Sequence, residues 1–387
     1  LPRSPASEAS NPSQDIMSES TVKIGLFGIG LDAYWPQFEG LRERLVSYLQ
    51  STFERLSRSG AEVVNLGLVD SIPRAVEAGH RFRREDVDLI FLHVTTYALS
   101  STVLPVVRRA KVPVIILNLQ PVKSINYARF NQLGDRTRMT GEWLAHCAAC
   151  PVPELSNVFQ RSGIQFQEIT GTLDEDPECW DEVAEWIAAA KVCYALEHNN
   201  LGLMGHYYSG MLDIYSDITG LSATFGGNIH MLEVNELSNL RESFSEEDVR
   251  VQSERIHEIF DVQPDCPASE IDRAARTALG LEKLAEIHDL GSMAYFSKGT
   301  GVAENEDTMS SIILGNSMLT GNGVPVAGEY EVKNVLAMKI LDTLGVGGSF
   351  TEYYALDYDD DIVLMGHDGP GHIAIANGKV KVRPLEV

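Results

Sequence analysis

The feature that most constrains the fold is a regular alternation of apolar runs and amphipathic segments from residue 22 onward. The apolar runs, which predict buried strands, are residues 22–29, 61–66, 87–94 and 112–117. The segments with helical spacing are residues 36–56, 72–78 and 99–109, with Pro36 expected in the first helical turn. Because such an order is typical of a parallel sheet covered on both faces, we predict a doubly wound α/β domain. Its binding loops are expected at the carboxyl ends of the strands.

The second half of the chain repeats this pattern. The expected strands are residues 201–204, 229–234 and 293–296, and the expected helices are residues 180–190, 244–260 and 269–289. Ser269 is predicted to be the N-cap of the last of these helices. The glycine-rich segment 296–328 is expected to consist mainly of loops, which often carry ligand contacts.

The predicted fold is therefore α/β, with two doubly wound parallel-sheet domains of Rossmann or flavodoxin type, followed by the start of a β-rich C-terminal domain. The expected division is a disordered lead-in rich in Ser, Pro and Glu, an N-terminal α/β domain, a central α/β domain and an incomplete C-terminal domain. Their bounds are residues 1–20, 21–172, 173–344 and 345–387.

Composition narrows the class of protein. The chain has 387 residues with 31 basic and 55 acidic side chains, giving a formal net charge of -24. This charge argues against binding to nucleic acid or to anionic membranes. No apolar window of about 18 residues is present, so no membrane span is expected. The 5 cysteines are an odd number spread thinly, which favours reduced thiols and a cytoplasmic location.

Three potential metal ligands lie within residues 328–372. Glu329 precedes a predicted helix, Glu352 lies in an aromatic strand, and His367 follows an apolar run in a glycine-rich turn. The period-2 face of Glu352 also carries Phe350, Tyr354 and Leu356. A carboxylate among aromatic side chains needs a partner, and either a metal ion or a basic side chain serves. Each residue taken alone also has a simple structural explanation: Glu329 as a helix cap, Glu352 as a solvated acid and His367 as a loop histidine.

Two other loops carry candidate residues. Residues 28–33 match a dinucleotide-binding pattern by letter, but three residues precede the next helix and no acidic residue ends the second strand, which argues against an NAD-dependent oxidoreductase. Tyr34, beside this loop, and His206, after the strand at 201–204, are candidate substrate contacts. A lone histidine such as His206 more often has a packing or hydrogen-bonding role.

The region around these ligands resembles the L-arabinose isomerase and L-fucose isomerase superfamily, and is closer to the arabinose branch. The residues that carry the resemblance are Ala327, Gly328, Glu329 and Lys333, then residues 347–352, then residues 364–367. By this resemblance Glu329, Glu352 and His367 match three of four metal ligands. The fourth is a histidine of the family's C-terminal β-barrel, which His372 does not match. Tyr330, Glu331 and the turn at 368–372 depart from the arabinose enzymes, which leaves the sugar open.

The resemblance implies a cytoplasmic, metal-dependent aldose-ketose isomerase acting on L-arabinose or a related sugar. Mn²⁺ is the expected ion, and homo-oligomers with sites shared between subunits are implied. Glu329 and Glu352 would act as base and acid around an ene-diol, although a metal-assisted hydride shift uses much the same residues. The alternative is a non-catalytic sugar-binding protein, since two α/β domains around a cleft also describe such binders.

Overall fold

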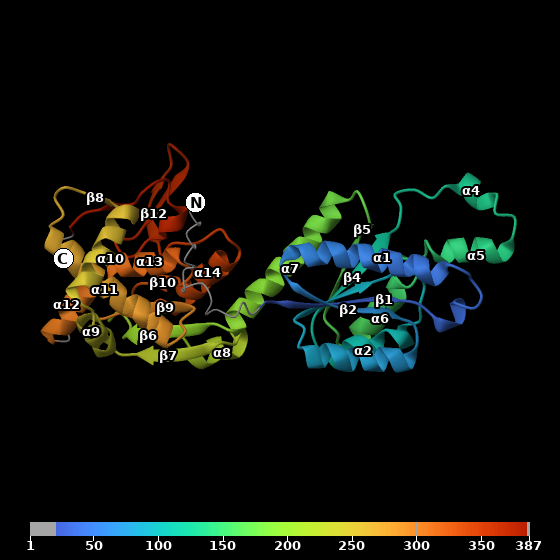
Figure 1. The fold of residues 1–387 in the computed structure, drawn as a ribbon, viewed down its shortest axis with the longest axis horizontal. Helices are drawn as coiled ribbons and strands as arrows, with labels where there is room; N and C mark the ends of the chain where they lie inside the picture. Colours follow the sequence, from blue (N-terminus) through green and yellow to red (C-terminus); the bar gives the residue numbers. More distant parts are fainter. Residues whose placement is uncertain (1–20, 299–300, 385–387) are drawn as a thin grey trace, which may run out of the picture. The chain divides into compact units, whose positions relative to one another are not determined.

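The structure, a computed structural model, describes residues 21–298 and 301–384. The chain divides into two compact units between Lys191 and Val192, inside helix α7 (Pro177–Glu197; Figure 1). The predicted boundary at residue 172 lies at the end of strand β5 (Phe166–Thr172), before the start of α7. Residues 345–384 group with the second unit. The predicted lead-in, residues 1–20, lies outside the described residues.

The first unit contains a five-stranded sheet in the order β2-β1-β3-β4-β5, and every neighbouring pair is parallel. The strands are β1 (Lys23–Ile29), β2 (Glu62–Val69), β3 (Leu89–His93), β4 (Val114–Gln120) and β5 (Phe166–Thr172). Sequence reasoning did not predict β5. Its side chains are mostly exposed or half-buried, so the apolar run that marks the other strands is absent.

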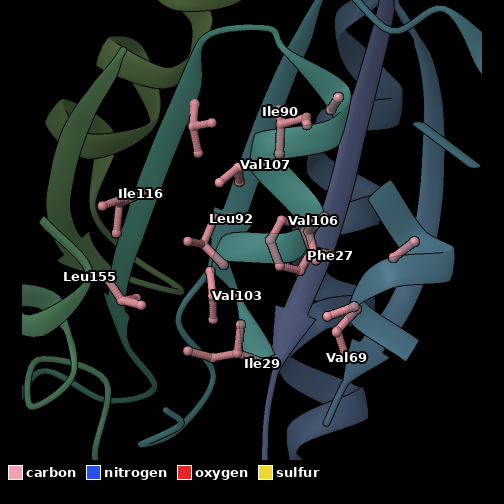
Figure 2. Close-up of a cluster of buried hydrophobic side chains, with 14 of the residues drawn as sticks. Phe27, Ile29, Val69, Ile90, Leu92, Val103, Val106, Val107, Ile116 and Leu155 are labelled. Carbon is pink, nitrogen blue, oxygen red and sulfur yellow. The ribbon is translucent and has the colours of Figure 1, made fainter. Parts of the chain in front are cut away.

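The helices of the first unit are α1 (Leu41–Leu56), α2 (Ile72–Glu85), α3 (Leu104–Ala110), α4 (Tyr127–Asn131), α5 (Arg136–Leu144) and α6 (Val152–Arg161). They cover both faces of this sheet or, in the case of α4 and α5, lie beyond its carboxyl edge (Figure 1). In the core cluster of Figure 2, the strand residues Ile29, Ile90 and Leu92 share one cluster with helix residues. The helix residues are Val106 and Val107 of α3 and Leu155 of α6. Figure 1 shows α1 and α2 on opposite faces. Burial on both faces accounts for the continuous apolar strands.

The prediction that Pro36 lies in the first turn of a helix is wrong. A 3-10 helix (Asp32–Tyr34) and turns precede α1, which begins only at Leu41 after Gly40 with a φ of 77°. The loop is anchored by Trp35, whose indole N–H donates to Asp70 at 2.8 Å. The left-handed backbone at Gly40 prevents the helix from extending back to Pro36.

The second unit contains a four-stranded parallel sheet in the order β10-β9-β6-β7. The strands are β6 (Asn200–Gly205), β7 (Asn228–Leu232), β9 (Ser292–Phe296) and β10 (Val326–Ala327). Successive residues point to opposite faces, so Leu203 and Met204 join two different core clusters. The predicted α/β class with parallel sheets is thus confirmed in both units.

The second unit's helices correct two predictions. They are α8 (Ile218–Phe225), α9 (Val234–Glu242), α10 (Glu246–Ile259), α11 (Ala268–Ile287), α12 (Ala303–Ser310), α13 (Ile313–Gly321) and α14 (Val332–Thr343). Segment 296–328, expected to consist mainly of loops, contains α12 and α13. Burial of Met318 and Leu319 outweighs the low helix propensity of the surrounding glycines. Ser269 is inside α11, whose N-cap is Pro267.

Residues 345–384 add short strands. Strands β11 (Glu352–Asp357) and β12 (Ile362–Gly366) pair as an antiparallel hairpin, and β13 (Lys381–Val382) pairs in parallel with β8 (Asp261–Val262). Every residue of β11 is exposed. Within residues 21–298 and 301–384, no helix combines the length and apolar character needed to cross a membrane.

The close packing of α2 on α3 gives a prediction. A Cβ added at Gly79 would lie 2.7 Å from the carbonyl oxygens of Pro105 and Val106. We expect Gly79→Ala to destabilise the first unit by roughly 1–3 kcal/mol, although alanine gains about 1 kcal/mol in helix propensity. Thermal unfolding would measure this, with exposed Arg83→Ala on the same helix as the control. A stabilised Gly79→Ala would contradict the packing.

Candidate active site

Glu329 lies in the loop between β10 and α14, at the carboxyl edge of the second sheet. Glu329 and Tyr330 both have left-handed backbones, with φ values of 57° and 65°. Such conformations are costly for residues other than glycine and persist only where the surroundings impose them. Here the Tyr330 N–H donates to the Tyr295 carbonyl at 3.1 Å, and the buried Tyr330 ring packs on Tyr207 with centroids 4.7 Å apart. The loop is therefore held firmly against neighbouring strand ends.

His367 follows β12 and faces Glu329. Its ring packs on Phe350 with centroids 4.4 Å apart, and its Nδ1 accepts a hydrogen bond from the Gly369 N–H at 3.0 Å. Because Nδ1 accepts, the neutral ring carries its proton on Nε2. That nitrogen lies 3.8 Å from Glu329 Oε1, longer than a hydrogen bond but within ion-pair range.

Gly328 allows this arrangement. A Cβ at Gly328 would lie 2.9 Å from the ring of Phe350, so only glycine lets that ring pack directly on the strand end. Phe350 is buried, and the ring of His367 also packs on it. The glycine, the aromatic ring and the imidazole thus form one packed group beside Glu329.

The electrostatics of Glu329 are unusual for a carboxylate. Partial burial raises the pKa of Glu329, the negative charges of Glu352 and Asp368 raise it further, and the attraction of His367 opposes the rise. Desolvation disfavours the charged form of an acid, so the net direction follows from the burial of this side chain. A raised pKa suits a carboxyl group that must both take and return a proton.

Glu352 does not have the predicted surroundings. It is the first residue of β11 and is exposed, and so are Tyr354 and Leu356, while only Phe350 of the expected aromatic face is buried. The expectation of a buried carboxylate among aromatics is therefore wrong at Glu352. The physical reason is that β11 pairs only with β12, and no second layer covers the hairpin among the described residues. Glu352 acts on Glu329 through its charge.

The described residues do not by themselves fit a metal centre. Glu329 Oε1 and His367 Nε2 are 3.8 Å apart, within twice the typical metal-ligand distance of about 2.1 Å. However, nowhere in the described part of the chain are three His, Cys, Asp or Glu side chains arranged to hold an ion. His372 is buried elsewhere, with Nε2 2.7 Å from where a Cβ of Gly347 would lie. Two donors of the predicted three thus face one another.

The candidate substrate contacts fall in different units. Tyr34 belongs to the first unit, in the 3-10 helix before α1, where burial raises the pKa of its hydroxyl. His206 belongs to the second unit and follows β6, at the same edge of the sheet as Glu329. Its exposed ring lies against Phe296 at 5.4 Å, and its Nδ1 is 2.8 Å from the Tyr207 carbonyl. His206 is thus available to a ligand at that edge.

Sequence reasoning missed two neighbours of the pair. Asp368 Oδ1 lies 3.3 Å from His367 Nδ1, and its charge also reaches Tyr295, whose pKa burial raises to about 12. Asp368 could have been found, because it directly follows His367 in the sequence. Tyr295 carried no signal, since a tyrosine in a buried strand is ordinary.

The raised pKa of Glu329 predicts the effect of removing its charge. The pKa of Glu329 is higher in the folded state than in the unfolded state. Ionisation of this carboxyl therefore lowers the free energy of unfolding as the pH rises from the unfolded-state pKa through the folded-state pKa. Glu329→Gln should therefore raise the melting temperature at pH 7, by about 2 °C, and have no such effect near pH 4. Thermal unfolding at both pH values would measure this, with exposed Asp360→Asn as control. Destabilisation at pH 7 would show that the carboxylate is favourably paired.

Comparison with known proteins leaves the family open. No protein-family model matches the chain, and no curated protein matches its sequence. A carbohydrate transporter from Acidothermus cellulolyticus 11B in complex with myo-inositol is 11% identical, over 84% of this chain and 88% of that one, with a TM-score of 0.20. A sugar ABC transport substrate-binding protein from Bordetella parapertussis 12822 is 10% identical, over 87% and 85%, with a TM-score of 0.19. Escherichia coli D-lactate dehydrogenase is 8% identical, over 84% and 95%, with a TM-score of 0.18. Scores this low carry no argument, and the α/β class rests on the two parallel sheets.

Proposed function

We propose that the chain is an aldose-ketose isomerase that acts on L-arabinose or a related sugar. The observation that carries the proposal is the pairing of Glu329 with His367 at the carboxyl edge of a parallel sheet, where burial raises the pKa of the carboxyl. Ligand sites of doubly wound sheets lie at this edge. A partly desolvated carboxylate beside an imidazole is a common arrangement for proton transfer.

The reaction needs a proton to move between neighbouring carbons. Glu329 would remove the proton from the carbon next to the aldehyde, and the C–H electrons would form the carbon-carbon double bond of an ene-diol as the carbonyl oxygen gains a proton. Glu329 would then return its proton to the former carbonyl carbon, while the hydroxyl on the neighbouring carbon loses its proton to solvent and becomes the ketone carbonyl. That proton balances the one that solvent supplies to the aldehyde oxygen in the first step. Its raised pKa aids the return step, because the protonated form is easier to reach near neutral pH.

His367 and Glu352 have supporting roles in this proposal. The Nε2–H of His367 points toward Glu329 and can donate to a substrate oxygen that lies between them. Glu352 is exposed and acts as the second acid-base group at the rim of the site. Mn²⁺ and a homo-oligomer remain expectations of the resemblance. The proton transfer proposed above uses the side chains of this chain alone.

Activity of carboxylate variants tests this function. Ketose formation from a panel of aldoses that includes L-arabinose would be measured with and without added Mn²⁺. We expect Glu329→Gln to lower kcat/KM by about 10²-fold or more, since it removes the base. Asp360→Asn, at the far end of the hairpin from Glu352, should leave kcat/KM unchanged.

The same panel separates the isomerase from the sugar-binding alternative. Saturable sugar binding by calorimetry without ketose formation, under both metal conditions, would overturn the isomerase and favour a binding protein. Conversion that survives Glu329→Gln would retain an isomerase but place its base elsewhere.

A further inference from the structure

A large cavity lies within the first unit, away from the residues discussed above. Its volume is about 820 Å³, and it is lined by the loop after β1, the start of α1, the loop after β4, α4 and α5. Figure 1 shows α4 and α5 beyond the carboxyl ends of the strands. The strand order reverses between β1 and β3, and crevices beside such a reversal are where doubly wound sheets bind ligands. A volume of this size accommodates a small molecule.

Three arginines line this cavity, and they differ in how they are held. Arg44 donates to Glu142 Oε2 at 2.7 Å and to the Tyr48 hydroxyl at 2.6 Å, so its charge is already paired. Arg129 and Arg138 are exposed, and their guanidinium groups form no ion pair with any residue in 21–298 or 301–384. The cavity therefore presents two guanidinium groups free to bind a ligand.

The positive charges of Arg129 and Arg138 contrast with the acidic composition of the chain. The chain's formal net charge is -24, because 55 acidic side chains outnumber 31 basic ones, and a net charge of this sign disfavours the approach of anions. Among the described residues that line the cavity, Glu39 is the one acid without an ion pair, which leaves the two free arginines in excess. Guanidinium groups bind phosphate and carboxylate through paired N–H donors, and a neutral sugar offers no such partner.

The remaining wall is suited to the body of a small molecule. Apolar side chains line it together with the arginines, among them Phe38, Val122, Ile125, Phe130 and Leu133. Val122 and Ile125 are exposed, although apolar side chains of this size are usually covered. A ligand that combines an anionic group with a less polar body would contact both kinds of wall.

We propose that this cavity binds an anionic small molecule, a phosphate ester, whose phosphate contacts Arg129 and Arg138 and whose body lies against the apolar wall. The site is built from residues of the first unit alone. It is independent of Glu329 and His367 and does not require the isomerase proposal.

Calorimetry with four proteins tests this site. D-ribose 5-phosphate, inorganic phosphate and D-ribose would each be titrated into the full chain at low ionic strength, where charge pairing is least screened. We expect the ester to bind more tightly than inorganic phosphate, inorganic phosphate to compete with it, and D-ribose not to bind at this site. Arg129→Gln and Arg138→Gln should each weaken the ester by about tenfold. Arg136→Gln is the matched control, because Arg136 lies on α5 but does not line the cavity.

The outcomes separate clearly. Binding that depends on Arg129 and Arg138 but not on Arg136 supports the site. The proposal is overturned if neither the ester nor inorganic phosphate binds, if D-ribose or inorganic phosphate binds as tightly as the ester, or if Arg136→Gln weakens the ester as much as Arg138→Gln. Unchanged thermal unfolding of the variants would show that a loss of binding is not a loss of folding.

Discussion

Parallel strand pairing is the constraint on which the rest of the structure depends. A parallel pair needs a crossover connection, and the crossover helices bury both faces of the sheet. Strand β6 shows this burial, because its neighbouring residues Leu203 and Met204 belong to two different core clusters. It also places the carboxyl ends of all strands along one edge. Glu329 and His206 lie at that edge in the second unit, and the arginine-lined cavity lies at the corresponding edge of the first.

At the carboxyl edge of the second unit's sheet, backbone strain and burial both affect the side chain of Glu329. The left-handed backbone at Glu329 and Tyr330 is held by the Tyr295 carbonyl and by packing of the Tyr330 ring. This fixes the Glu329 carboxyl where it loses solvent and faces His367. Strain of this kind clusters at functional sites and persists only where the surrounding structure imposes it.

Some of this arrangement could be predicted from the sequence and some could not. The buried strands followed from continuous apolar runs, and the expectation that Glu329, Glu352 and His367 share one site came with the resemblance to the isomerase superfamily. The start of α1 was missed because Gly40 sets it, through a left-handed φ that Pro36 does not reveal. Helix α13 was missed because its stability comes from buried contacts of Met318 and Leu319. The exposure of Glu352 was missed because periodicity shows which residues share a face and does not show whether another layer covers it.

The most direct test is the ionisation of Glu329 itself. The titration of its carboxyl carbon can be followed by NMR in selectively labelled protein, with the signal assigned by its loss in Glu329→Gln. The account predicts a pKa above the ordinary carboxyl range, and a further rise in His367→Gln, because the side chain that opposes the rise is gone. An ordinary or lowered pKa, or one that His367→Gln leaves unchanged, would contradict the proposed pairing.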